Sequence, residues 1–247
     1  MEALVGIAVG AAVFYVWIWS RFRGVGAWWK RAEQMKRFEQ ALRDAREAAE
    51  GPSPYRVARA ETDGELLALL RIADSHREAL ESSGFRSLGD LVVERRGEAL
   101  MVSRMLVSHD GVTLAAISVT RKNPTRVFVA LSSYTGERQH ATTRGEVPSL
   151  ARPPFVSITN LPPDTSIEKL VAAHVAPEGA RVTASIDDVL ARLAELRERT
   201  VTWRASQSPD ELLDADLRAL LGKAYDKGGK MWAAKLRGKL PEARLQR

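Results

Sequence analysis

The 247-residue sequence contains no cysteine, and its four histidines (His76, His109, His140 and His174) lie far apart. There is therefore no thiolate to bind metal or act as a nucleophile, and no H-x-x-x-H or H-E-x-x-H pattern occurs. The absence of cysteine also fits a reducing compartment. No G-x-S-x-G, P-loop or strand-linked G-x-G-x-x-G occurs either. The sequence thus predicts no catalytic, cofactor-binding or metal-binding residue and favours a protein that is not an enzyme.

Charge is missing from the 17 residues Ala3–Trp19, which are almost wholly apolar. This length approaches that of a bilayer-spanning helix, and Trp17 and Trp19 suit the headgroup level. Residues 21–37 follow with six Lys or Arg and one acid. The positive-inside rule then predicts a single-pass anchor over residues 1–20 in the cell membrane, with the N-terminus outside and the rest cytoplasmic. A cleaved signal peptide is the main alternative, but it would need a basic start.

Two patterns near the anchor favour a homodimer. Gly6 and Gly10 form a G-x-x-x-G, which lets two membrane helices approach closely. In the predicted stalk helix of residues 21–50, Met35, Phe38 and Leu42 form an a/d seam. Two plainer interpretations stay open: small residues are common in membrane helices, and the stalk can pack on its own domain. A linker is predicted over residues 51–60.

The C-terminal residues 223–247 carry eight basic side chains and two acids. Met231–Leu240 within this tail is a basic amphipathic segment. It suits a solvated helix end or a surface for anionic lipid, which would make the chain a lipid-binding adaptor. Nucleic acid is the least favoured partner, because no recognition-helix pattern is present.

Residues 61–222 are predicted to form one α+β domain with an antiparallel sheet and three or four helices. Branched aliphatic runs predict strands at Leu91–Val93, Leu100–Val107, Val112–Thr120 and Thr125–Ser133. Arg138–Arg144 is polar and suits a sheet edge. Because the connecting turns, such as His109-Asp110-Gly111, are short, we expect a meander of four or five antiparallel strands.

Capping patterns predict where helices begin. Thr62 with Glu65 predicts a helix that ends near Gly84, and Thr165 with Glu168 predicts a short helix to Val175. Ser185 is expected to cap a longer helix. Ser208 followed by Pro209 is the strongest start pattern in the chain.

From Gly84-Phe85 onward the chain resembles a group of uncharacterised bacterial membrane-anchored proteins. The resemblance covers about residues 65–200 and lies in a few short motifs: Gly84-Phe85, Gly89-Asp90, Asp110-Gly111, Thr142-Thr143, and Leu170 with His174. It implies an α+β fold and no particular activity.

The favoured function is a membrane-tethered, cytoplasmic-facing binding or scaffold module. An enzyme that assembles its site from His109, His140, His174 and carboxylates across the sheet is the alternative.

Overall fold

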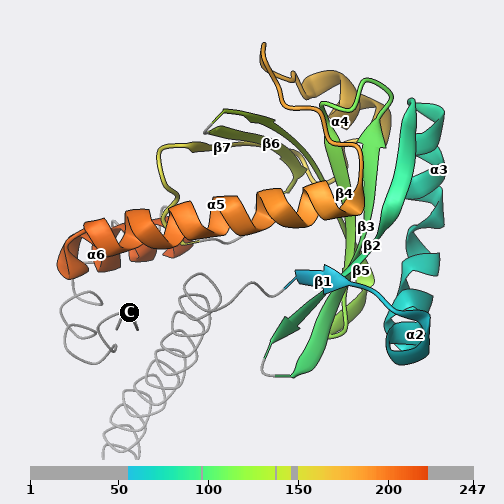
Figure 1. Cartoon of the computed structure of the whole chain (residues 1–247), viewed down its shortest axis with the longest axis horizontal. Helices are drawn as coiled ribbons and strands as arrows, with labels where there is room; N and C mark the ends of the chain where they lie inside the picture. Colours follow the sequence, from blue (N-terminus) through green and yellow to red (C-terminus); the bar gives the residue numbers. More distant parts are fainter. Residues whose placement is uncertain (1–54, 96, 137, 146–149, 222–247) are drawn as a thin grey trace, which may run out of the picture. The chain divides into compact units, whose positions relative to one another are not determined.

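The computed structural model describes residues 55–95, 97–136, 138–145 and 150–221 (Figure 1). They form a mixed α+β domain around a seven-stranded sheet, in which the strands lie side by side in chain order. The strands are β1 (Tyr55–Val57), β2 (Phe85–Arg95), β3 (Glu98–Ser108), β4 (Leu114–Thr120), β5 (Asn123–Thr135), β6 (Arg138–Arg144) and β7 (Val156–Leu161). The helices are α2 (Ala60–Leu69), the 3-10 helix η1 (Leu70–Ala73), α3 (Asp74–Ser82), α4 (Ile167–Ala173), α5 (Ile186–Ser206) and α6 (Pro209–Leu221).

The predicted antiparallel meander is confirmed from β2 to β6, but the sheet is larger than expected. β1 adds an antiparallel strand from the segment predicted as a linker. β7 pairs with β6 in parallel, so the sheet is not wholly antiparallel and β6 is not an edge strand. β7 can pair in parallel with β6 because the connection between the two strands is much longer than a hairpin turn.

Side chains alternate across the strands, and each face of the sheet has its own apolar cluster. On one face Leu106 and Ile117 pack with residues of α2, η1, α3 and α4. On the other, Met105 and Leu114 pack against Val189 of α5. In Figure 1, α5 crosses the sheet on the side away from α2 and α3. The period of two in each strand explains how neighbouring residues serve opposite faces.

The first predicted helix begins and runs differently from expectation. It starts at Ala60, and its N-cap residue Arg59 makes no side-chain cap bond, so the capping box at Thr62 is wrong. The carboxylate of Asp63 instead accepts a hydrogen bond from the Arg59 backbone N–H at 2.8 Å. This buried carboxylate also pairs with Arg56, which explains why Asp63 rather than Thr62 satisfies the free N–H. The segment up to Gly84 is divided into α2, η1 and α3.

The later helix starts agree better. Ser166, not Thr165, caps α4, so that expectation was wrong by one residue. Ser185 caps α5 and shares a complete capping box with Asp188, whose carboxylate accepts from the Ser185 backbone. α6 begins at Pro209, and the side chain of Ser208 accepts from the backbone of Glu211 at 3.2 Å. These contacts confirm the helix starts predicted at Ser185 and Ser208.

Several predictions concern residues outside the described ranges. They are the anchor, the stalk, the Gly6–Gly10 pattern, the seam at Met35, Phe38 and Leu42, and the basic tail of residues 223–247. Within the ranges that are described, no helix combines the length and the apolar character that crossing a membrane requires.

Candidate functional site

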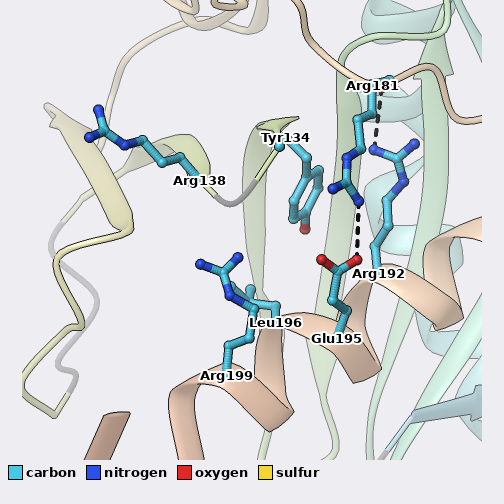
Figure 2. Close-up of a pocket in the computed structure, with 8 residues that line it drawn as sticks. Tyr134, Arg138, Arg181, Arg192, Glu195, Leu196 and Arg199 are labelled. Atoms are coloured by element: carbon cyan, nitrogen blue, oxygen red, sulfur yellow. Dashed lines mark hydrogen bonds and ion pairs between the residues drawn. The ribbon is translucent and has the colours of Figure 1, made fainter. Parts of the chain in front are cut away.

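A pocket lined by four arginines lies between the end of β5 and α5. It holds about 280 Å³ of space, part of it open to solvent. We call it the arginine pocket. Its lining residues are Tyr134, Gly136, Arg138, Arg181, Arg192, Glu195, Leu196 and Arg199 (Figure 2).

Helical spacing places three residues of this lining. Arg192, Leu196 and Arg199 are separated by four and three residues along α5. Residues at such intervals lie on one face of a helix, so the three side chains project toward the same surface. Ser185 and Asp188 set the start of α5 and thereby the direction of this face.

The loop before α5 supplies Arg181, and backbone pairing holds this loop against β5. The Arg181 N–H donates to the Tyr134 carbonyl at 2.7 Å. Thr135 and Ala180 form an isolated antiparallel bridge beside it. The β5–β6 turn continues through Gly136, whose φ of +43° lies in the left-handed region that glycine adopts without strain. Arg181 is thereby brought to the end of β5.

One ion pair lies inside the arginine pocket. Arg181 Nη1 is 3.2 Å from Glu195 Oε2, and their side chains are 44% and 45% exposed. Figure 2 shows the two groups facing each other. An ion pair this exposed contributes only about 0–1 kcal/mol to stability, because water screens it. Glu195 can therefore leave Arg181 at little cost.

Arg192 is held by neutral groups. Its guanidinium donates to the carbonyl of Arg181 at 3.3 Å and to that of Val182. The guanidinium carbon also lies 5.6 Å from the centre of the Tyr134 ring. Burial raises the pKa of the Tyr134 phenol, so this ring is uncharged at neutral pH. These contacts orient Arg192, and the Asp188 carboxylate one turn earlier on α5 also interacts with its charge.

The remaining two arginines come from α5 and β6. The guanidinium of Arg199 lies over the Phe155 ring, 4.3 Å from its centre. Arg138, the first residue of β6, is exposed, and within the described ranges no ion pair involves it. Figure 2 shows its side chain directed away from Tyr134. By residue type the lining carries four positive charges and one negative charge, and the Arg138 charge is the one directed away from Tyr134.

The arginine pocket is suited to binding an anion. Guanidinium groups present paired N–H donors that match carboxylate and phosphate oxygens, and a concave surface of one charge sign concentrates the field. Sequence reasoning missed these residues. The spacing of Arg192 and Arg199 on a capped helix was a usable signal, but Arg138 and Arg181 join them only in the fold.

The structure brings two of the three histidines of the enzyme alternative near each other, because His140 on β6 pairs in register with Ser133, a contact of His174. His174, at the end of α4, lies between two hydroxyls: its Nε2 is 3.0 Å from Ser133 Oγ and its Nδ1 is 2.9 Å from Thr142 Oγ1. Burial, with a smaller contribution from His140, lowers the pKa of His174. His109 lies apart in the β3–β4 turn, where Asp110 accepts from the Val112 N–H as expected of turn chemistry.

This histidine network has the features of a structural contact. Ser133 is completely buried, so no substrate reaches its hydroxyl. Its Oγ instead lies 3.3 Å from the buried Thr113 hydroxyl, which extends the network into the core. Across the part of the chain that the structure describes, no group of three or more His, Asp or Glu could hold a metal ion.

A second polar centre is structural. The guanidinium of Arg204 on α5 meets the carboxylate of Asp216 on α6 through two hydrogen bonds of 3.1 and 2.9 Å. The two side chains are 2% and 0% exposed. Asp216 also accepts from the Ala151 backbone N–H at 3.0 Å. The pair therefore joins α5, α6 and the segment before β7.

Comparison of the chain with protein-family models, with curated proteins and with solved structures finds no match.

Proposed function

We propose that this chain is a membrane-tethered binding module whose cytoplasmic α+β domain holds an anionic group of its ligand in the arginine pocket. The observation that supports this most directly is the charge of the pocket lining, four arginines against one glutamate. The glutamate is already paired with Arg181. An anion that enters gains charge-assisted hydrogen bonds, which contribute about 1.5–3 kcal/mol each.

The membrane part of the proposal rests on the sequence. Ala3–Trp19 is apolar and uncharged, and the basic residues follow it. A domain tethered at the cytoplasmic leaflet meets its ligand close to the bilayer. The Gly6–Gly10 pattern and the stalk seam support a homodimer, in which two arginine pockets would act together with a higher effective concentration.

Membrane insertion can be tested with a charge at the centre of the proposed span. Arginine in place of Val9 should cost about 2.5–3.5 kcal/mol on the insertion scale and lower the membrane-bound fraction. Val9→Leu is the matched control, because it keeps the span apolar. The measurement is the distribution of the full chain between pellet and supernatant after high-speed centrifugation. Wild-type protein in the supernatant would contradict the tether.

Anion binding can be tested by calorimetry on the full chain in neutral detergent, with pyrophosphate as the probe at constant ionic strength. Arg181→Gln should weaken saturable binding about tenfold or more, since it removes one charge-assisted contact. Arg71→Gln is the control: Arg71 is exposed on η1, at the opposite face of the sheet, and its loss changes the net charge equally. Pyrophosphate that does not bind saturably, or that binds both variants alike, would contradict the pocket as the site.

The homodimer can be tested by cross-linking in native membranes. Leucine at Gly6 and Gly10 should lower the cross-linked fraction, because larger side chains hold the helices apart. A purely monomeric pattern for the wild type would remove the dimer and leave the rest of the proposal intact.

A further inference from the structure

The arginine pocket already contains a carboxylate, and this limits which anion can enter it. Glu195 belongs to the same chain as Arg181, so its effective concentration at that arginine is high, of the order of millimolar or more for a short connection. When a ligand with a single carboxylate binds Arg181, it merely replaces the carboxylate of Glu195 with its own. It therefore gains little from the exchange.

We infer that the arginine pocket selects a phosphomonoester dianion over a carboxylate, an inference that rests on the proposed function. A phosphomonoester carries close to two charges at neutral pH and has three acceptor oxygens. It can displace Glu195 from Arg181 and still accept hydrogen bonds from a second guanidinium, so the exchange yields a net gain. Binding involves no covalent step.

The neighbours of Arg181 make this second contact available. Arg192 donates to the Arg181 carbonyl and is otherwise held by the Val182 carbonyl and the Tyr134 ring, which are neutral. These contacts do not neutralise its charge, and the Asp188 carboxylate one turn earlier on α5 offsets that charge only in part, so Arg192 attracts the second charge of the ligand. The loop that carries Arg181 is joined to β5 by backbone contacts, and Arg192 is oriented by its hydrogen bonds to the Arg181 and Val182 carbonyls. Both arginines are therefore placed before the ligand arrives.

The size of the arginine pocket indicates that a terminal group is recognised, not a whole large ligand. Its space of about 280 Å³ includes a part open to solvent. The enclosed part of that space is far smaller than the cavities that surround a drug-sized molecule. The phosphate group therefore enters the pocket while the rest of the ligand extends past the exposed Arg138.

Glu195 acts as an internal competitor in this arrangement. When the phosphomonoester binds, its carboxylate turns into solvent, which is a small step for a side chain already 45% exposed. Glutamine at this position keeps the shape but removes the competing charge. Glu195→Gln is therefore expected to strengthen binding of every anion, and most of all the binding of a monocarboxylate, which competes least well with Glu195.

The test compares three probes that share one phenyl ring: phenyl phosphate, phenyl sulfate and benzoate. Their binding to the full chain in neutral detergent is measured by calorimetry at pH 8 and constant ionic strength. We expect phenyl phosphate to bind the wild type at least tenfold more tightly than benzoate. Phenyl sulfate has the same arrangement of oxygens as phenyl phosphate but carries one charge. If charge determines the preference, its affinity should be close to that of benzoate.

The variants separate the inference from the proposed function. Glu195→Gln should narrow the preference for phenyl phosphate over benzoate by threefold or more, and Arg181→Gln should weaken phenyl phosphate about tenfold. Arg71→Gln should leave all three affinities unchanged. Equal binding of phenyl phosphate and benzoate to the wild type, with loss of both in Arg181→Gln, would overturn the inference and leave the proposed anion site standing. Saturable binding of none of the three probes would overturn both.

A phosphomonoester can be a free metabolite or a lipid headgroup, and a further experiment distinguishes these sources. The full chain is placed in phosphatidylcholine nanodiscs with or without phosphatidic acid, and phenyl phosphate is titrated. If phosphatidic acid blocks the binding of phenyl phosphate equally in the wild type and in Arg71→Gln, the ligand is a lipid headgroup. Unchanged binding identifies a soluble ligand. Both results support the same chemical class.

Discussion

Alanine in place of Asp216 is expected to lower the free energy of unfolding by about 3–5 kcal/mol, because it removes the carboxylate that pairs with a buried guanidinium. Arg204 and Asp216 are 2% and 0% exposed and share two hydrogen bonds. The substitution also removes the acceptor of the Ala151 N–H. Leaving the Ala151 N–H unsatisfied would itself cost about 1–3 kcal/mol, which is part of the expected total of about 3–5 kcal/mol.

The same helix offers a matched control. Asp214 pairs with Arg218 at 3.5 Å, and their side chains are 41% and 61% exposed. Asp214→Ala removes the same functional group but should cost less than about 1 kcal/mol, since water screens an exposed pair. A double variant, Arg204→Met with Asp216→Leu, should be more stable than Asp216→Ala, because it removes both buried charges and not just one of them.

The assay is urea unfolding of the full chain in neutral detergent, followed by circular dichroism, with the free energy obtained by linear extrapolation. The variants can be compared only if the free energy of unfolding falls with urea concentration at the same slope in each of them. The reasoning is refuted if Asp216→Ala lies within about 1 kcal/mol of the wild type, or if it costs no more than Asp214→Ala.

Three further perturbations test other parts of the fold. Hydrogen bonding to the Arg56 guanidinium lowers the pKa of Asp63, so the ionised carboxylate stabilises the fold above the ordinary carboxyl pKa, and this stabilisation is lost on acidification. In urea unfolding at pH 7, Asp63→Asn should lower the free energy of unfolding by about 1–3 kcal/mol. Burial lowers the pKa of His174, so the unfolded state takes up protons more readily and stability should fall as pH drops below about 6.5. His174→Gln should reduce that fall in measurements between pH 7 and 5, and an unchanged slope would argue against this origin. Gly111 has a φ of +77°, and a Cβ there would lie 2.8 Å from Cγ1 of Val182. Gly111→Ala should therefore lower the melting temperature more than Gly97→Ala, where φ is +80° but space is open.

Local patterns predicted much of the domain. The alternation in β4 and β5 and the turn at Asp110-Gly111 indicated the antiparallel meander, because each of these features acts over a few residues. Ser185 and Ser208 were identified as helix starts for the same reason, since a cap is satisfied by a backbone N–H only three residues away.

The misplaced features depend on distant partners. Asp63, not Thr62, satisfies the start of α2 because Arg56 on β1 holds its carboxylate. β1 has three residues, too few for a periodic signal, and forms only because β2 offers it an edge. β7 pairs in parallel with β6, a choice that no short-range pattern encodes.

The sequence by itself determined the periodicity of the strands, the strongest helix caps and the separation of an apolar, uncharged N-terminal stretch from a globular remainder. Each of these follows from residues close together in the chain. Only the tertiary structure decided that Arg138, Arg181, Arg192 and Arg199 share one pocket and that Arg204 meets Asp216 out of water. The physical reason is that charge density and burial are properties of positions in space, and strand pairing and helix packing set those positions over separations that no local pattern spans.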